Sequence, residues 1–446
     1  MKRVGAFFLL LVCLCFCGCQ KSSVKGTNPN VVVILIDALR MDRLHDYGNA
    51  RKTNPFLAEF GKRGIRFTNA YSHSSHTKIS VASLFTGLIP PLHGVRHIDF
   101  PWEEEKIRLF SDILSSPLTT ISEVLLKKGY RTAAFVTNPF LKSSFGFSQG
   151  FQDYRYIDLP QGKAKQLNGE VINWLKQPRK GPFFIYIHYM DIHAPYRPSL
   201  PYRHLYTQKK NLLPYGSNGP YQGQVNEEGL QYTRDCYDAQ VNYWDDCFKK
   251  LIQEMETKGW TDNTVFIILS DHGEEFYDHG GFGHGFTLYE EQLRVPLYIV
   301  FQGRIPPAQV RKDRVEIIDI FPTVCALAGQ KVQGLDPQGK NILASERMSP
   351  DAFHYAETAL GKAPASVQTE KYKLIFNTAE KSFELYDLAK DRREQTNIIS
   401  QKTAWARAGQ KELFKLMSLR RPGVRQSKRE LDRETIEALK SLGYIR

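Results

Sequence analysis

The run VVVILID, from Val31 to Asp37, decides how this chain is expected to fold. It is a continuous, largely β-branched stretch that ends in a carboxylate, and such uninterrupted apolar runs are typical of central strands in parallel sheets. Four more runs of this kind follow along the chain: TAAFVTN (Thr132 to Asn138), PFFIYIHYMD (Pro182 to Asp191), TVFIILSDHG (Thr264 to Gly273) and PLYIVFQG (Pro296 to Gly303). The sequence therefore predicts a mostly parallel sheet.

Helical patterns separate these strand-like runs. From Leu230 to Met255, apolar residues recur every three or four positions, which predicts one long amphipathic helix. Alternating strands and helices predict an α/β fold with helices on both faces of the sheet. Ligands of such sheets bind beyond the carboxyl ends of the strands, where Asp37, Asp191 and Asp271 are expected.

The chain of 446 residues is longer than a domain with a single hydrophobic core usually is, so a large domain with a smaller appendage is expected. Strand-like KYKLIF (Lys371 to Phe376) and FELYDL (Phe383 to Leu388) indicate a small α+β subdomain near the C-terminus. The basic tail from Lys402 to Arg429 is interpreted as a solvated helical face. The expected segments are a signal peptide at 1–19, a spacer at 20–30, the large domain at 31–330 and the C-terminal subdomain at 331–446.

The N-terminus has the layout of a secretory signal. Lys2 and Arg3 precede an apolar run from Ala6 to Cys17, which is too short to span a bilayer. The residues around Cys19, FCGC, resemble a bacterial lipobox, which implies that Cys19 becomes the lipid-modified first residue of the mature protein. The alternative is a plain signal peptide cut nearby. The expected location is the bacterial cell envelope, with a lipid anchor in a membrane and the protein facing the periplasm or exterior.

The composition is that of an ordinary globular protein, with 42% hydrophobic and 24% charged residues. Four of the seven cysteines lie at or before Cys19, so the three that remain argue against a disulfide framework. The net charge of +13 favours anionic substrates or an anionic membrane, and a purely solubilising surface is an equal alternative. No nucleic-acid-binding motif accompanies the charge, so no nucleic-acid partner is expected.

Three separated segments resemble the sulfatase family of the alkaline-phosphatase superfamily. They are NVVVILIDALRMDRL (Asn30 to Leu44), HTKISVASLFTGLIPPLHGV (His76 to Val95), and DNTVFIILSDHGEEF with the later GHGFTLYEEQLRVPL (Asp262 to Leu297). The likeness continues through HYMDIHAPY, IDIFPTVCALAG and ELYDLAKDRREQTNI in the family's order. It implies an alkaline-phosphatase-like sheet sandwiched by helices, and a hydrolase of sulfate or phosphate esters.

The resemblance also implies a metal centre. The family pattern places Asp37, Asp271 and His272 on one divalent cation, together with the nucleophile at position 77. Many sulfatases have a second Asp where this chain has Ala38, and Asn where it has His272. An imidazole ligand shifts the preference from Ca²⁺ towards Mn²⁺, Zn²⁺ or iron.

The nucleophile position departs from the family. The family signature is Cys or Ser, any residue, Pro, any residue, Arg, and its five positions hold Thr77, Lys78, Ile79, Ser80 and Val81. Formylglycine, which sulfatases make from that Cys or Ser, is therefore not expected. Thr77 resembles the unmodified threonine nucleophile of the superfamily's phosphoryl-transfer branches, at a helix start that attracts anions. The alternative is that Thr77 only caps this helix.

Several other residues match family positions around the ester. His193 and His284 are expected to contact the substrate and to protonate the leaving oxygen. Lys78 is expected to add positive charge for the anion, although its side chain could as easily face solvent. Supporting or less certain roles are assigned to the remaining matches: His188, His279, Asp191, Glu274, Arg294 and Asp245.

The predicted function is hydrolysis of an anionic sulfate or phosphate ester, on a glycan or a lipid, with phosphoryl esters favoured. Two alternatives remain open. One is a phosphoryl-group transferase of the envelope, whose relatives usually carry several transmembrane helices. The other is a catalytically inactive lipoprotein that binds anionic glycans, which the missing Pro and Arg beside Thr77 suggest. The oligomeric state is left open.

Overall fold

The computed structural model describes most of the chain from residue 28 to residue 442. The expected signal peptide and Cys19 lie outside the described residues. Within 28–442 the undescribed positions are 97, 100–108, 159–163, 179, 210–213, 216–223, 332–333, 335–336, 345–347, 359, 402 and 425–426.

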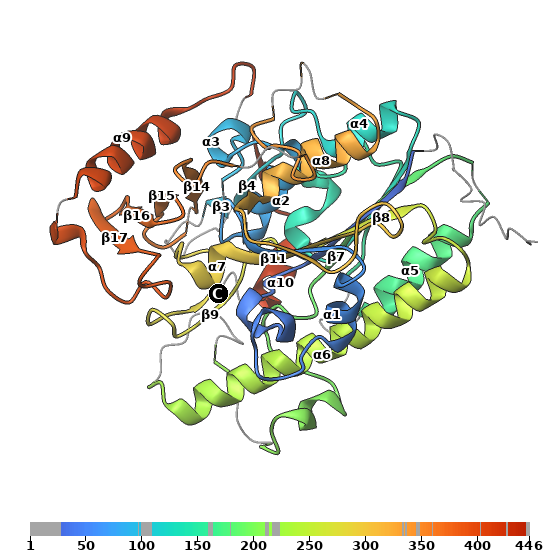
Figure 1. Cartoon of the computed structure of the whole chain (residues 1–446), viewed down its shortest axis with the longest axis horizontal. Helices are drawn as coiled ribbons and strands as arrows, with labels where there is room; N and C mark the ends of the chain where they lie inside the picture. The colour runs from blue at the N-terminus through green and yellow to red at the C-terminus, as the bar shows by residue number, and fades with distance from the viewer. Residues whose placement is uncertain are drawn as a thin grey trace, which may run out of the picture.

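A nine-stranded sheet runs through the centre of the molecule (Figure 1). Its order is β12-β2-β11-β8-β1-β7-β5-β6, with β13 also paired to β2. The strands are β1 (Asn30–Ile36), β2 (Ile65–Tyr71), β5 (Arg131–Val136), β6 (Asp153–Tyr156), β7 (Phe183–Tyr189), β8 (Thr264–Leu269), β11 (Arg294–Val300), β12 (Gln309–Arg311) and β13 (Val315–Glu316).

All five predicted runs form strands of this sheet, and β1 lies in the middle, parallel to β7 and β8. Leu35 of β1 pairs with His188 on one side and with Leu269 on the other, so these three strands end at one edge. Strand β11 is antiparallel to both β2 and β8, whereas the other pairings in the sheet are parallel. The mostly parallel sheet is therefore confirmed.

Side chains of β1 alternate between two cores. Val31, Val33 and Leu35 face one core and Val32, Ile34 and Ile36 the other, as expected for a strand buried on both faces. Helices α2 (Thr77–Thr86), α4 (Ile121–Lys127) and α8 (Ile320–Leu327) cover the first face, and α1 (Pro55–Gly61), α5 (Ala164–Lys176) and α6 (Glu227–Thr257) cover the second (Figure 1). The long helix predicted over residues 230–255 is α6.

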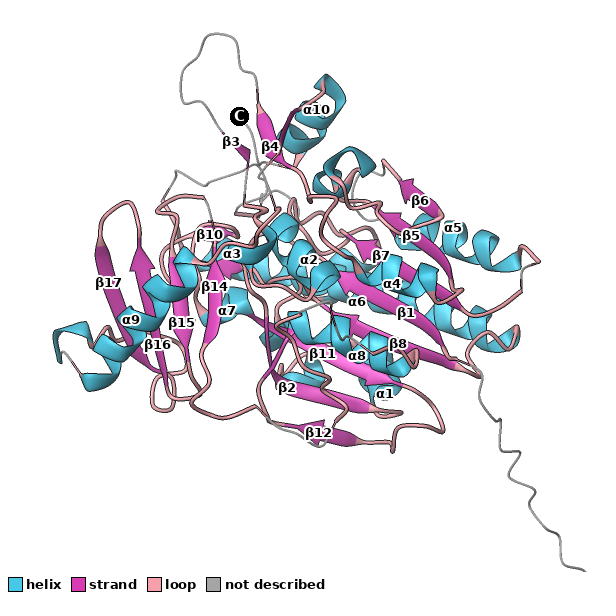
Figure 2. Cartoon of the chain, turned by 90° about the horizontal axis from the view of Figure 1, so that it is seen from above, coloured by secondary structure: helices cyan, strands magenta, loops and turns pink. Residues whose placement is uncertain are grey.

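A second, antiparallel sheet lies to one side of the first (Figure 2). It consists of β14 (His354–Glu357), β15 (Ala365–Gln368), β16 (Tyr372–Asn377) and β17 (Ser382–Asp387), and α9 (Ala404–Ser418) packs on it. The expected C-terminal α+β subdomain is thus present, and the basic tail is largely α9. Short elements complete the description: α3 (Pro90–His93), β3 (Ile98–Asp99), β4 (Phe110–Asp112), β9 (Glu275–Phe276), β10 (Phe282–Gly283) and α7 (Glu290–Leu293).

The last described segment returns to the large domain. Strand β18 (Lys428–Glu430) pairs with β4, and Leu431 and Leu439, the latter in α10 (Arg433–Ser441), join the core of the large sheet. The expected boundary at residue 331 therefore does not separate this segment from the large domain. Cys236, Cys247 and Cys325 are buried and free, in agreement with the absence of a disulfide framework among them. Among the described residues, no helix combines the length and the apolar character needed to cross a bilayer.

The N-terminus of α1 is capped by a side chain from another helix. The two carboxylate oxygens of Asp245, in α6, accept hydrogen bonds of 2.8 Å from the backbone N–H groups of Phe56 and Leu57. We expect Asp245→Ala to lower the free energy of unfolding by about 2 kcal/mol, because two buried donors lose their acceptor. Urea denaturation measures the change. Gln253→Ala, at an exposed position of the same helix, is the control, and equal midpoints for the two variants would contradict this role of Asp245.

Candidate active site

Polar side chains converge where the central strands end. Asp37 directly follows β1, Asp271 and His272 follow β8, and His188 lies on β7 beside the last residues of β1. Asn138 follows β5, the next strand along. All five side chains are buried, so their polar atoms depend on each other for partners.

Asp37 is the centre of this group. Its Oδ2 accepts hydrogen bonds from Asn138 Nδ2 at 2.7 Å and from His188 Nε2 at 2.9 Å. Burial alone would raise the pKa of the Asp37 carboxyl, yet the hydrogen bond from His188 and the nearby imidazoles hold that pKa well below its ordinary value. The carboxyl is therefore ionised, and its Oδ1 lies 3.6 Å from His272 Nε2.

Asp271 and His272 complete the opposite side. His272 Nδ1 lies 2.8 Å from the Gly273 carbonyl and donates to it, which leaves Nε2 with a lone pair directed at the group. Asp271 Oδ2 lies 3.4 Å from that Nε2 and has no hydrogen bond within the described part of the chain. Burial and the charge of Asp37 both raise the pKa of the Asp271 carboxyl.

Thr77 is the first residue of α2 and faces the same point. Its Oγ1 lies 3.1 Å from His272 Nε2 and 3.4 Å from Asp37 Oδ2. The helix N-terminus behind it carries partial positive charge, which favours an anion or an ionised hydroxyl. The side chain that accepts the N-terminal hydrogen bond of this helix belongs to His76, whose Nδ1 lies 3.3 Å from the Lys78 N–H. The Thr77 hydroxyl is thus turned towards the carboxylates.

These residues fit a divalent cation. One ligand atom from each of Asp37, Asp271 and His272 lies within 4.8 Å of the others, and all three side chains are buried. Two carboxylates at this separation repel each other, and a cation between them would offset the repulsion that raises the pKa of Asp271. The unbonded Asp271 Oδ2 and the His272 lone pair are the kind of donors that such an ion requires.

Two further histidines lie over this centre. The His284 ring is 4.2 Å from the His272 ring, and the His193 ring is 4.8 Å from the His284 ring, between centroids. Glu274 accepts hydrogen bonds from His284 Nδ1 at 2.9 Å and from the Tyr196 hydroxyl at 2.7 Å. Burial would raise the pKa of Glu274, but the charge and hydrogen bond of His284 lower it, so the carboxylate is ionised beside the imidazole.

Lys78 does not join this group. Its ammonium is buried, donates a hydrogen bond to the Ser111 hydroxyl and lies 4.0 Å from the centre of the Phe145 ring. Burial lowers its pKa to about 7. Among the described residues, no hydrogen bond or ion pair connects the Lys78 ammonium to Asp37, His193, His272 or His284. A role for Lys78 in anion binding stays a prediction, and this placement does not support it.

The remaining residues singled out in the sequence lie around the site. Asp191 accepts a hydrogen bond from the Ala164 N–H at 2.8 Å and thereby caps α5, while Arg294 donates to the Thr68 carbonyl. His279 pairs with Glu291 at 2.9 Å, which, against the opposing effect of burial, raises its pKa to about 9. Asp191 and Arg294, like Asp245 described above, support the scaffold.

Two contributors to the site were not predicted, namely Asn138 and Tyr196. Asn138 closes the run TAAFVTN, and its position at a strand end was the signal that could have identified it. Tyr196 closes HYMDIHAPY, and only the folded structure shows that its hydroxyl reaches Glu274.

Known families and proteins match most of the chain. The family model described as "Sulfatase" matches residues 29–330, and the model "N-sulphoglucosamine sulphohydrolase, C-terminal" matches residues 277–420. The chain is 24% identical to an arylsulfatase of Clostridium perfringens over 83% of this chain and 90% of that protein. It is 22% identical to a choline-sulfatase of Rhizobium meliloti over 83% of this chain and 82% of that protein.

Solved structures share the fold. A complex with its substrate D-glucosamine-2-N,6-O-disulfate has a TM-score of 0.70 at 20% identity, covering 93% of this chain and 98% of that one. The phosphonate monoester hydrolase of Agrobacterium radiobacter has a TM-score of 0.68 at 20% identity, covering 87% of this chain and 95% of that one. At this level of identity the likeness establishes the architecture, so the expected alkaline-phosphatase-like fold is confirmed.

Proposed function

The chain belongs to the sulfatase family, and from this premise we propose that it is a metal-dependent hydrolase of sulfate or phosphate esters with Thr77 as nucleophile. One observation carries the proposal: the Thr77 hydroxyl lies 3.1 Å from His272 Nε2 and 3.4 Å from Asp37, inside a buried set of cation ligands. A threonine that only capped α2 would have no reason to lie among cation ligands. The side chain that caps α2 through a hydrogen bond is that of His76.

The residues divide the chemistry between them. Asp37, Asp271, His272 and the Thr77 oxygen would hold one divalent cation, which supplies positive charge that draws the anionic ester and favours an ionised hydroxyl. The Asp37 carboxylate lies 3.4 Å from Thr77 Oγ1 and can accept its proton. Attack by this oxygen on sulfur or phosphorus forms a covalent ester and breaks the bond to the leaving oxygen. Water then releases sulfate or phosphate and restores Thr77.

His284 and His193 serve the leaving group. The Glu274 carboxylate accepts a hydrogen bond from His284 Nδ1, and the His193 ring packs against the His284 ring. Either imidazole can give its proton to the departing alkoxide as the bond breaks. Tyr196 fixes the second oxygen of Glu274 and so orients this pair.

We favour phosphoryl esters over sulfate esters as the preferred substrates. The position of the formylglycine precursor holds Thr77, so the nucleophile here is an unmodified hydroxyl. Support for phosphoryl chemistry on this architecture comes from the phosphonate monoester hydrolase with a TM-score of 0.68. The cation would be Mn²⁺, Zn²⁺ or iron in preference to Ca²⁺, because His272 contributes an imidazole nitrogen.

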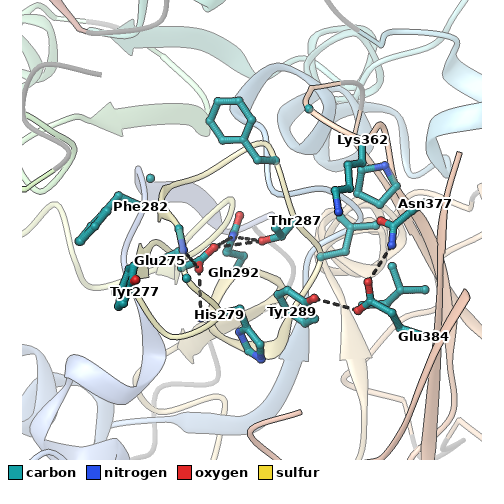
Figure 3. A pocket seen from close by; sticks show the side chains of 18 of the residues that line it. Glu275, Tyr277, His279, Phe282, Thr287, Tyr289, Gln292, Lys362, Asn377 and Glu384 are labelled. Atoms are coloured by element: carbon teal, nitrogen blue, oxygen red, sulfur yellow. Dashed lines mark hydrogen bonds between the residues drawn. The ribbon is translucent and has the colours of Figure 1, made fainter. Parts of the chain in front are cut away.

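A glycan is the substrate class that the neighbouring pocket favours. Figure 3 shows a cavity whose volume is about 600 Å³. Its wall includes Gly283, which directly precedes His284 in sequence. The rings of Tyr277 and Phe282 stack 5.5 Å apart on one side, and Lys362 and Glu384 lie on the other. Aromatic faces with a few polar groups suit sugar rings and their hydroxyls. Two solved structures that share the fold are complexes with a neocarrahexaose and with glucosamine disulfate.

The proposal includes a location in the bacterial cell envelope. It rests on the sequence around Cys19, which resembles a lipobox and would tether the mature protein to a membrane by a lipid anchor. Metabolic labelling with a lipid precursor, compared between wild type and Cys19→Ala, measures this directly. Equal labelling of the two proteins would remove the anchor from the proposal.

A substrate and metal panel tests the function. Protein lacking residues 1–19 is stripped with a chelator and assayed on aryl phosphate, aryl sulfate, a phosphodiester and a phosphonate, with each of Mn²⁺, Zn²⁺, Fe²⁺ and Ca²⁺. We expect turnover that depends on the added cation, with phosphoryl esters hydrolysed at least about tenfold faster than aryl sulfate. Faster hydrolysis of sulfate with an aldehyde at position 77 would overturn the chemistry proposed. A protein inert with every cation that still binds anionic glycans would favour a binding function.

A further inference from the structure

A second group of metal-binding side chains lies outside the site described above. His73 follows β2, Glu316 ends β13 and His354 begins β14, so the three come from both sheets. All three are buried, and one ligand atom from each lies within 4.8 Å of the others. We propose that His73, Glu316 and His354 form a second, structural site for a zinc-like divalent cation, which ties the C-terminal sheet to the large sheet.

The orientation of His73 supports a lone pair directed into this group. Its Nδ1 lies 2.6 Å from the carbonyl of Tyr355 and donates to it, so that in the neutral ring the lone pair is on Nε2. This Nε2 lies 3.3 Å from Glu316 Oε2. Two acceptors that face each other at such a distance are unfavourable unless a positive charge lies between them. A backbone carbonyl that holds the far nitrogen is also the usual partner of a metal-binding imidazole.

The geometry suits tetrahedral coordination. Ligand bonds of about 2.0–2.1 Å around zinc place neighbouring ligand atoms roughly 3.3 Å apart, which is the separation of His73 Nε2 and Glu316 Oε2. The His354 ring lies 4.8 Å from the His73 ring between centroids, tilted by 39°. Two imidazoles and one carboxylate form a donor set that zinc accepts and Ca²⁺ does not favour.

His354 provides an independent observation. It is fully buried, and neither of its ring nitrogens has a hydrogen-bond partner among the described residues. Burying an imidazole without any partner is unfavourable, and native proteins rarely leave such groups unsatisfied. A neutral imidazole carries a lone pair on one of its two ring nitrogens. A cation held by that lone pair would satisfy it.

Arg314 is the charged residue beside Glu316, and it bears on the alternative to a bound cation. Arg314 Nε lies 3.5 Å from Glu316 Oε1, and the Arg314 guanidinium also donates to the carbonyls of Ala352 and Gln368 and contacts Met348 Sδ. Arg314 thus neutralises the oxygen of Glu316 that points away from His73. Without a cation, the alternative is a protonated His73 paired with Glu316, which would still leave His354 unsatisfied.

Two further charged groups lie close by. Asp319 accepts the Glu316 N–H at 2.8 Å and the Lys340 N–H at 2.7 Å, so its oxygens are engaged by backbone. The Lys373 ammonium is held by Glu394 at 3.0 Å and by Glu290 at 3.6 Å. Neither residue is therefore a ligand, and the proposed site consists of the three residues named.

Metal stoichiometry tests the proposal without using activity. The chain is stripped with a chelator, loaded with Zn²⁺, freed of excess ion and analysed by mass spectrometry of the metal. We expect about two ions per chain in the wild type and about one in Asp271→Asn, which loses the site at Thr77 but keeps His354. His354→Gln should also hold about one, and the double variant none. An Asp271→Asn protein without any bound ion would overturn the second site.

Cobalt loading keeps the test decisive if His354→Gln fails to fold. In Asp271→Asn, Co²⁺ at the second site should give visible absorption typical of tetrahedral nitrogen and oxygen ligands, together with a rise in the unfolding temperature. X-ray absorption should count two imidazoles around this ion.

The matched control is His93→Gln, because His93 is a buried histidine near His73 whose Nε2 lies 3.1 Å from Ser83 Oγ. Loss of the cobalt signal in this control, or a spectrum without imidazole, would contradict the assignment.

Discussion

Thr77→Ala is expected to lower kcat on an aryl phosphate by at least about 1,000-fold, because it removes the only side-chain oxygen proposed to form the covalent intermediate. The hydroxyl lies 3.1 Å from His272 Nε2 and 3.4 Å from Asp37, so its loss removes the nucleophile but leaves the ligands Asp37, Asp271 and His272 in place. The measurement is kcat at saturating cation and substrate. Circular dichroism and cation content should remain close to wild type, since the cap of α2 is His76.

Two variants make this result specific. Thr77→Ser keeps a hydroxyl at the same place and should retain activity within about tenfold. Thr86→Ala removes the threonine at the other end of the same helix, whose Oγ1 bonds the Ala82 carbonyl at 2.7 Å, and should leave kcat unchanged. Rapid quenching of wild type with a slow substrate should show a phosphorylated peptide that contains Thr77. Thr77→Ala that turns over at the wild-type rate would show that the nucleophile is another group.

The sheet could be predicted because its strands are marked by composition. Buried parallel strands need apolar side chains on both faces, and runs such as VVVILID satisfy this without any other information. Direction is not marked in the same way. PLYIVFQG is also a mainly apolar run, yet β11 is antiparallel to both neighbours. An apolar run has no feature that predicts which of the two orientations its strand adopts.

The site residues could be predicted only where they belong to a sequence motif of the family. Asp37 and Asp191 both follow apolar strands, and nothing local distinguishes them, but Asp37 lies among the histidines while Asp191 caps α5. Asn138 is the third such residue, and its bond to Asp37 joins positions that are 101 residues apart in sequence. Contacts of this kind depend on strand order, which the sequence of a single chain does not encode locally.

Lys78 shows the same limit at a shorter range. It is adjacent to Thr77, and its charge suggested a contact with the anion. On a helix, however, neighbouring side chains point in directions about 100° apart, as follows from 3.6 residues per turn. Lys78 therefore turns away from the carboxylates and reaches Ser111 and the Phe145 ring.

The second large effect concerns the ligand at the end of β1. Asp37→Asn should lower cation affinity by at least about 100-fold and kcat by at least about 1,000-fold, because it removes the ionised carboxylate from a buried ligand set. An amide at this position can still accept one hydrogen bond from His188 or Asn138, so the fold should persist. Isothermal titration with Mn²⁺ measures the affinity, and the aryl phosphate assay measures kcat at cation concentrations that saturate the variant.

Asp191→Asn is the matched control, because Asp191 also follows a buried strand of the same sheet and is itself buried. Its amide oxygen can still accept the Ala164 N–H, so the cap of α5 is kept and cation affinity should stay within about twofold of wild type. The comparison distinguishes a carboxylate that binds the cation from a buried carboxylate that the fold merely requires. If both variants lost affinity equally, the loss would reflect weakened folding, and if neither did, Asp37 would not be a ligand.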